Sequence, residues 1–427
     1  MSSKVPKSAV ATSVPGRRPT AVALPGFFLA GRRILDPLLF GLLPLAFAAL
    51  VMYAEARQGL LGFDFKGTIW QPGHEILAGH SPYPRPLAAA MDSGNPSVYP
   101  PVVLLLALPY ALVPFTIAYA AWTVTLVAAV LVALRILGAR DWRCYTIALG
   151  SLPVAYGLAL GNLVVLLVPL LACAWRYRAS PRWSGLAVGA GIALKLVLWP
   201  LLVWFIVTRR WRAAFIAAAS AVMSMVCAWA ILGFDGLRDY PQLLRVNNDL
   251  YAAHSWSLFA GGVGLGLPWS VASALASLAG VALLALAFVS IRRRNGDRIA
   301  FCVVVVASIA CLPIVWPASL VLLLVPIVLV APSADLIWVL LTALWLGAAV
   351  PRQLADAGSP STDAPSIVWR MQHAGPPTAQ IAAFTALVAL ITVLVLRRAG
   401  RIRSVDPGTS CLRVPRPDGG GLGPPPR

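Results

Sequence analysis

The chain has 427 residues, of which 59% are hydrophobic and only 11% are charged. A soluble domain carries about 25% charged residues, so this composition excludes an ordinary soluble protein and predicts a membrane protein. The formal net charge of +19 does not indicate nucleic-acid binding, because the basic residues lie in short clusters between hydrophobic runs and in the two tails, as in the cytoplasmic loops of membrane proteins.

Apolar stretches recur through the whole chain, without the alternating polar residues that barrel strands show. A transmembrane helix needs about 20 apolar residues, so we expect an all-α polytopic membrane protein with about ten to twelve transmembrane helices. These helices should form one domain, residues 34–398, in a bacterial-type inner (plasma) membrane. Residues 1–33 and 399–427 are predicted to be disordered cytoplasmic tails, because the first is basic and the second is rich in Gly, Pro and Arg.

The first span is expected near residues 34–54. Because the tail before it is basic, this span should run from the inside to the outside. The polar segment 55–97 then lies on the outer face, with a helical piece at about residues 68–78. For this chain the segment has an unusual density of charged side chains, among them Asp64 and Lys66.

The next hydrophobic region begins after Tyr99 and extends to about residue 137. It fits either two full spans or a short helix plus one span, and the basic loop 135–143 favours the second arrangement because such loops prefer the inside. Two further spans, near 146–160 and 163–175, are expected to meet at Gly161-Asn162.

Segment 184–208 is bounded by basic clusters on both sides and carries Lys195 near its middle. Two half-length helices that enter and leave from the same face would place Lys195 in a polar cavity. One continuous span with a snorkelling or paired lysine is the alternative. Beyond it we expect further outer loops at 233–266 and 351–378, and spans near residues 213–232, 271–291, 300–315, 318–330, 336–350 and 379–396.

Motifs of soluble enzymes are missing from the sequence. There is no Walker loop, no Gly-x-Gly-x-x-Gly in a βαβ unit, no HExxH and no GxSxG. Four scattered histidines and six cysteines without CxxC spacing show no metal-ligand pattern, and the cysteines are expected to be buried thiols. What remains is a set of polar residues at one face of a helical bundle.

That arrangement suits chemistry on a lipid-linked substrate. Such a site needs a carboxylate that takes a proton from an acceptor hydroxyl, and cations that stabilise a leaving phosphate. Asp64 is the candidate base, with an ordinary solvated loop carboxylate as the alternative interpretation. The candidate phosphate partners are Lys195, Lys66, Arg238 and Arg245.

Several short motifs, in their order and spacing over residues 34–332, resemble one family of membrane enzymes. They are Phe63-Asp64-Phe65, Ile76–Tyr83, Val98–Pro101, Leu108-Pro109, Gly161-Asn162, Gly185–Gly189, Ala193–Lys195, Arg209–Arg212, Asn248 and His254–Leu258. With these motifs the chain resembles the polyprenyl-phosphate-sugar-dependent glycosyltransferases of the GT-C fold. It is most similar to glycosyltransferase family 87 (the DUF2029 domain), whose members include actinobacterial α-mannosyltransferases.

The resemblance implies that Asp64 is the catalytic base of an outer-face site supplied with a polyprenyl-phosphate sugar. The acceptor would be a hydroxyl of a cell-envelope glycan or glycolipid, and the scheme requires no metal or other cofactor. The candidate substrate-binding residues are Tyr83, Tyr99, Asn162, Asn248 and His254. Aromatic side chains also belt membrane interfaces, and a histidine in a loop is commonly a surface residue, so structural roles remain the alternative for these positions.

The sequence departs from the family at three places. It has Gly161-Asn162 where the family usually has Gly-Gln, and its stretch Leu312–Ser319 contains neither Asp nor His. In addition, Lys195 is followed by Leu196, and the next proline is Pro200. The resemblance implies mannose as the donor sugar, and these departures make arabinofuranose nearly as compatible. Two other classes of function stay open, namely a transporter or flippase of lipid-linked sugars and a non-catalytic membrane scaffold.

Overall fold

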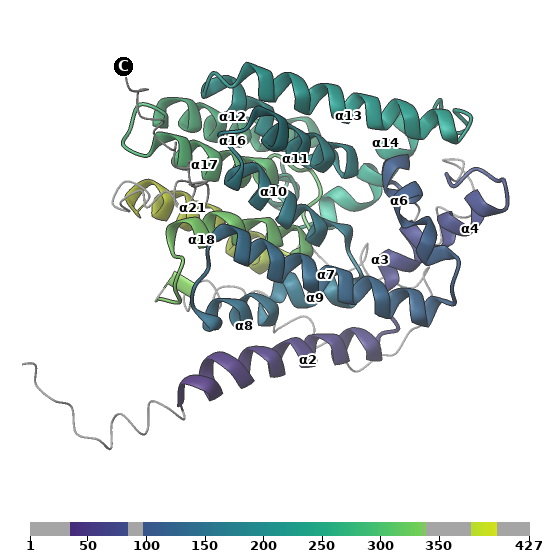
Figure 1. Ribbon diagram of the computed structural model, residues 1–427, viewed down its shortest axis with the longest axis horizontal. Helices are drawn as coiled ribbons and strands as arrows, with labels where there is room; N and C mark the ends of the chain where they lie inside the picture. Colours follow the sequence, from purple (N-terminus) through teal and green to yellow (C-terminus); the bar gives the residue numbers. More distant parts are fainter. Residues whose placement is uncertain (1–34, 84–96, 336, 339–376, 399–427) are drawn as a thin grey trace, which may run out of the picture.

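The computed structural model describes residues 35–83, 97–335, 337–338 and 377–398 (Figure 1). Within them the chain is helical and contains no strand. The predicted tails, most of the predicted span 336–350 and most of the outer loop 351–378 lie outside the described residues. The expectation of an all-α polytopic membrane protein is confirmed.

Five helices of the described part are long and apolar enough to cross a membrane. They are the helix Leu35–Arg57, which contains η1 (Leu38–Leu42) and α2 (Leu43–Arg57), and α7 (Phe115–Leu137), α13 (Trp211–Ile231), α16 (Trp269–Ser290) and α21 (Thr378–Arg398). A sixth span is reached if α9 (Leu152–Leu160) and the helix Leu163–Arg176, which contains η3 (Leu163–Leu166) and α10 (Leu167–Arg176), count as one span bent by 118°.

Within the described residues this count is lower than the ten to twelve spans expected for the whole chain. Most of one expected span lies outside these residues, and many apolar runs are divided into short helices. These are α6 (Pro101–Ala111), α8 (Trp142–Gly150), α11 (Pro181–Leu194), η4 (Leu196–Leu198), α12 (Leu201–Val207), α17 (Gly296–Ala310), η6 (Pro317–Leu323) and α18 (Leu324–Val330). Several breaks fall at a proline such as Pro153, Pro200 or Pro317, where the missing N–H and the ring interrupt an α-helix.

Two local predictions about these runs are confirmed. The region after Tyr99 is a short helix, α6, followed by one span, α7. Segment 184–208 is divided at Lys195, whose backbone is extended between α11 and η4. The helical piece expected near 68–78 is present as η2 (Lys66–Trp70) and α4 (Gln71–Leu77), which follow the single-turn helix α3 (Phe63–Phe65).

The core of the bundle is formed by α17, η6 and α18, in which almost every side chain is buried. The outer helix α13 packs on α11 through small residues. A Cβ on Gly185 would lie 2.8 Å from the carbonyl oxygen of Ala213, and one on Gly189 would lie 2.6 Å from that of Ala217. Close backbone contact of this kind is how transmembrane helices associate without a hydrophobic driving force between them.

Ion pairs tie the helix ends together where the basic clusters lie. The Asp297 carboxylate, in the first turn of α17, accepts two hydrogen bonds from the Arg210 guanidinium, each of 2.8 Å, and one from the Trp204 indole, also of 2.8 Å. Arg178 approaches the same carboxylate at 3.6 Å. Asp297 thus joins the starts of α13 and α17 to the end of α10.

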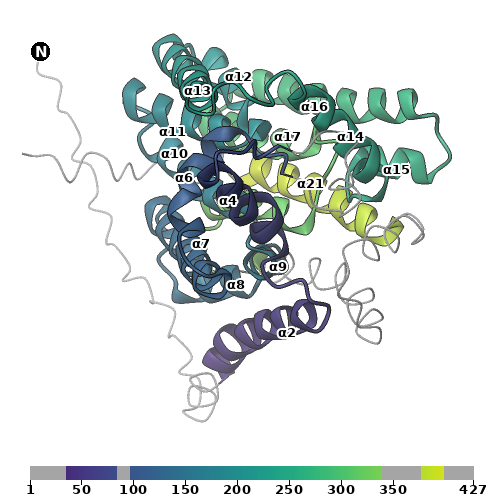
Figure 2. The same cartoon turned by 90° about the vertical axis from the view of Figure 1, so that its right-hand side faces the viewer.

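The remaining short elements gather at one end of the bundle, on the right in Figure 1. They are α3, η2, α4, α6, α14 (Tyr240–Tyr251), η5 (Ala252–His254) and α15 (Leu258–Gly264). Figure 2 looks onto this end, where α4 lies against α6 and α14 lies beside α15. The described parts of the polar segments that follow α2 and α13 therefore lie at the same end of the bundle, as two segments on one membrane face would.

Candidate active site

Asp64 lies on α3, and backbone geometry holds this short helix against the C-terminal end of α9. The N–H of Gly62, which has φ +67°, donates to the carbonyl oxygen of Ala159 at 2.7 Å. Gly161 ends α9 with φ +70°, and a Cβ there would lie only 2.6 Å from the Cβ of Phe65. Both positions require glycine, because a side chain is disfavoured at positive φ and would collide with its neighbours.

The Phe65 ring anchors α3 in the bundle. It is fully buried and stacks on Trp122 of α7, with ring centroids 5.2 Å apart, and meets Tyr110 edge to face at 6.0 Å. The Trp122 indole N–H donates to the carbonyl oxygen of Gly161 at 2.8 Å. The position of Asp64 is therefore set by an aromatic core contact one residue away.

Asn162 follows Gly161 directly and contacts the Asp64 carboxylate. Its Nδ2 donates to Asp64 Oδ2 at 2.6 Å, and its Oδ1 accepts a hydrogen bond of 3.0 Å from the backbone N–H of Val164. Asn162 is 6% exposed and stands where the chain turns by 118° from α9 into the helix 163–176. The bend is what directs this amide toward α3.

Lys195 reaches the same place from the break between α11 and η4. Its side chain is half-buried, and its Nζ lies 5.5 Å from the centroid of the Tyr99 ring. The charges of Lys195 and Asp64 attract each other, but the two side chains make no direct ion pair. Tyr99 is buried, and its phenol oxygen is hydrogen-bonded by the backbone of Leu163.

The surroundings raise the pKa of Asp64 to about 6. Burial is the largest cause, because loss of water disfavours the charged carboxylate. The Asn162 hydrogen bond and the Lys195 charge act in the opposite direction and keep the shift from being larger. A carboxylate with a pKa close to 6 is mostly ionised at neutral pH and is a stronger base than a solvated aspartate.

The segment that carries Tyr99 is held by two other tyrosines. The Tyr83 hydroxyl donates to the Tyr99 carbonyl oxygen at 3.0 Å, and the Tyr240 hydroxyl donates to the Val98 carbonyl oxygen at 2.9 Å. Tyr83 is buried, and its ring lies 5.2 Å from that of Trp229 on α13. Tyr83 therefore belongs to an aromatic cluster that holds the backbone of Tyr99 in place.

Tyr251, at the end of α14, was not among the residues predicted from the sequence. It is 9% exposed, feels the charge of Asp64, and meets the Trp316 ring edge to face with centroids 6.3 Å apart. It lies one helical turn after Asn248, and that i, i+3 spacing was the available sequence signal. Asn248 is half-buried, and its Oδ1 is buried without a hydrogen-bond partner. His254 is half-buried in η5, the next turn of the chain.

The other three predicted cations lie at the surface. Lys66 is exposed, with its Nζ 5.5 Å from the centroid of the Phe115 ring. Arg238, which precedes α14, and Arg245, which lies on α14, are exposed as well. Of the four candidate phosphate partners, Lys195 is the one that the fold brings into the partly buried group around Asp64.

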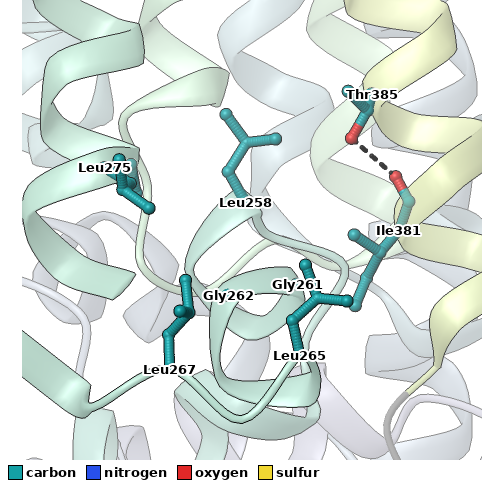
Figure 3. Close-up of a pocket in the computed structure, with 9 residues that line it drawn as sticks. Leu258, Gly261, Gly262, Leu265, Leu267, Leu275, Ile381 and Thr385 are labelled. Carbon is teal, nitrogen blue, oxygen red and sulfur yellow. Dashed lines mark hydrogen bonds between the residues drawn. The ribbon is translucent and has the colours of Figure 1, made fainter. Parts of the chain in front are cut away.

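An apolar groove of about 320 Å³ opens between α15, α16 and α21 (Figure 3). Its lining consists of Leu258, Gly261, Gly262, Leu265, Leu267, Leu275, Ala276, Ile381 and Thr385. The Thr385 hydroxyl donates to the Ile381 carbonyl oxygen at 2.8 Å, so the one polar side chain of the lining is satisfied within its own helix. Among the residues that the structure describes, no three metal-ligating side chains come together.

Comparison with known proteins identifies a family for this chain. Residues 98–313, about half of the chain, match the model of glycosyltransferase family 87. A polyprenol-phosphate-mannose-dependent alpha-(1-2)-phosphatidylinositol pentamannoside mannosyltransferase of Mycolicibacterium smegmatis is 29% identical over 164 residues, which cover 36% of this chain and 39% of that protein. No solved structure matches the chain.

Proposed function

The chain belongs to glycosyltransferase family 87, and we propose that it transfers a sugar from a polyprenyl-phosphate donor to a hydroxyl of a cell-envelope glycan or glycolipid. Mannose is the first candidate for the transferred sugar. The mannosyltransferase to which the chain is similar uses a donor and an acceptor of these kinds, according to its name. The chain is a multi-pass membrane glycosyltransferase. Its basic clusters favour a site on the extracytoplasmic face of the plasma membrane.

The proposed reaction is a single displacement with inversion at the anomeric carbon. Asp64 takes the proton from the acceptor hydroxyl as its oxygen forms a bond to the anomeric carbon of the donor. The bond from that carbon to the phosphate oxygen breaks at the same time, and its electron pair remains on the departing polyprenyl phosphate. Lys195 stabilises the charge that this phosphate gains.

The observation that carries the proposal is the relation between Asp64 and Lys195. Asp64 lies on the single-turn helix α3, and Lys195 lies at the break between α11 and η4. Both side chains are partly buried, and their opposite charges attract each other without forming a direct ion pair. A buried ion pair would neutralise both groups. Two opposite charges held apart at one site leave room for a reacting centre between a base and a leaving phosphate.

Transfer of radiolabel from polyprenyl-phosphate mannose to endogenous lipid acceptors tests the proposal, in membranes that contain the wild type or Asp64→Asn. Loss of a general base typically lowers a rate by about 10²- to 10⁴-fold, so the variant should form almost no product. Asp235→Asn, which changes an exposed carboxylate, is the matched control and should retain wild-type transfer. Near wild-type transfer by folded Asp64→Asn protein would overturn the role of Asp64.

The same preparation separates the proposal from its alternatives. Product from a polyprenyl-phosphate arabinofuranose donor, and none from mannose, would change the sugar but keep the reaction class. Movement of a lipid-linked sugar across vesicle membranes without bond cleavage would instead identify a flippase. The discontinuous helices at Asn162 and Lys195 make that assay worth running beside the first one.

A further inference from the structure

The amide of Asn162 has both of its ends engaged by the protein. Its Oδ1 accepts the N–H of Val164, two residues further on, and so caps η3. Because that backbone N–H can only donate, the oxygen must face Val164 and the nitrogen must face Asp64. The 2.6 Å contact between Nδ2 and Asp64 Oδ2 is therefore an amide donating to a carboxylate, in an orientation that the backbone dictates.

Other groups act on Asp64 through space. Lys195 attracts its charge from the α11–η4 break, and the hydroxyls of Tyr99 and Tyr251 feel its charge from the segment before α6 and from the end of α14. Asn162 differs from these groups because its side chain donates a hydrogen bond directly to the carboxylate, at Oδ2.

We propose that Asn162 is a positioning residue, which holds the Asp64 carboxylate in the orientation that a base requires, and that it does not bind the sugar. This inference rests on the proposed function, because it takes Asp64 as the base. A carboxylate fixed through one oxygen presents the other in one direction, and the acceptor hydroxyl then meets a base that is already oriented.

The length of the side chain matters to this role. Asparagine can cap the N–H of the second residue after it and still present its amide nitrogen to α3, because the cap forms a short local ring. A glutamine has one more methylene group between backbone and amide, so it would lose the cap or press into the carboxylate. The asparagine in Gly161-Asn162 therefore suits the 118° bend at this point in the chain.

Two substitutions separate the capping of η3 from the contact with Asp64. Serine is a good helix cap but is too short to reach Asp64, so Asn162→Ser keeps the bend and removes the donor. Asn162→Asp keeps an oxygen for the Val164 N–H and places a second carboxylate against the first. Asp141→Ser is the matched control, because Asp141 caps α8 by accepting the Arg143 N–H at 3.0 Å in the same i, i+2 pattern.

The test measures transfer as a function of pH, the KM for polyprenyl-phosphate mannose, and thermal stability. Loss of a hydrogen bond to a charged carboxylate raises its pKa by about one unit. In Asn162→Ser the acidic limb of the rate profile, which is the pH below which the rate falls, should therefore rise by about one unit from its wild-type value near pH 6. The KM for the donor should stay unchanged. Asn162→Asp should shift the limb further, because two adjacent carboxylates resist double ionisation. Asp141→Ser should leave the limb in place.

Two results would overturn the inference. A raised donor KM with an unmoved acidic limb in Asn162→Ser would show that the amide binds substrate. Lowered thermal stability with an unmoved limb would show that it only shapes the bend. If the wild type transfers neither sugar, the proposed function fails, but the role of Asn162 can still be tested. The infrared band of the protonated Asp64 carboxylic acid is the band that is missing in Asp64→Asn. Its titration with pH reports whether Asn162→Ser raises the pKa of Asp64.

Discussion

Substitution of Gly161 by alanine tests whether the contact between α9 and α3 positions Asp64, the proposed catalytic base. Alanine at φ +70° is strained by about 1–2 kcal/mol, because the left-handed region disfavours a Cβ. The new Cβ would also lie 2.6 Å from the Cβ of Phe65, and overpacking of a core costs about 1–3 kcal/mol. Together these effects should destabilise the protein by about 2–5 kcal/mol.

The same overlap should affect the reaction. Phe65 must move from 2.6 Å to at least the 3.4 Å of an ordinary contact, a shift of 0.8 Å, and Asp64 is the residue before it. A displacement of about 1 Å at a reacting group can lower a rate by about 10²-fold. Gly161→Ala should therefore retain little transfer activity even at temperatures where it is folded.

Gly138→Ala is the matched control for this substitution. Gly138 ends α7 at φ +86°, and a Cβ there would meet no atom within 4 Å, so only the cost of the left-handed backbone, about 1–2 kcal/mol, applies. Tryptophan fluorescence during thermal unfolding in detergent gives the stability of both variants, and sugar transfer gives their activity. If Gly161→Ala and Gly138→Ala lost equal stability and had equal activity, the reasoning would be refuted. Such a result would mean that the Phe65 side chain can move aside without displacing Asp64.

Two further predictions concern the pH dependence of transfer and the ion pair between Arg210 and Asp297. Asp64 must be ionised to act as a base. The transfer rate of the wild type should therefore be constant above the Asp64 pKa of about 6 and fall about tenfold per pH unit below it. A rate that stays constant down to pH 5 would exclude this carboxylate as the base. Arg210→Lys should lower stability by about 1–2 kcal/mol, because lysine cannot make both 2.8 Å hydrogen bonds to Asp297, whereas Arg212→Lys changes an exposed side chain and should leave the melting temperature unchanged.

Features that depend on the local chain were predictable from the sequence. Apolar length identified the long helices, and the charges around them favoured a short α6 followed by the span α7. A charged residue in the middle of an apolar run is costly, and this indicated the break at Lys195. The position of Asp64 just beyond the first span, together with the resemblance to a family, led to the candidate base.

The number of spans depended on tertiary structure. Short apolar helices such as α6, η4–α12 and η6–α18 look like spans when each run is judged by its composition. The breaks in the apolar runs direct polar groups such as Asn162 and Lys195 toward other helices. Hydropathy measures how apolar a segment is. It does not show whether backbone groups left unpaired at a helix break find hydrogen-bond partners on a neighbouring helix.

The sequence by itself determined that this is a helical membrane protein with polar chemistry gathered at one end, because those properties follow from hydrophobicity and charge along the chain. Only the tertiary structure decided which polar groups meet. The contact between Asp64 and Asn162 joins positions 98 residues apart, and it exists because of a 118° bend and the stacking of Phe65 on Trp122. The same packing buries Tyr83 behind Tyr99, brings in Tyr251 and leaves Arg238 exposed, since such contacts depend on how helices pack in three dimensions.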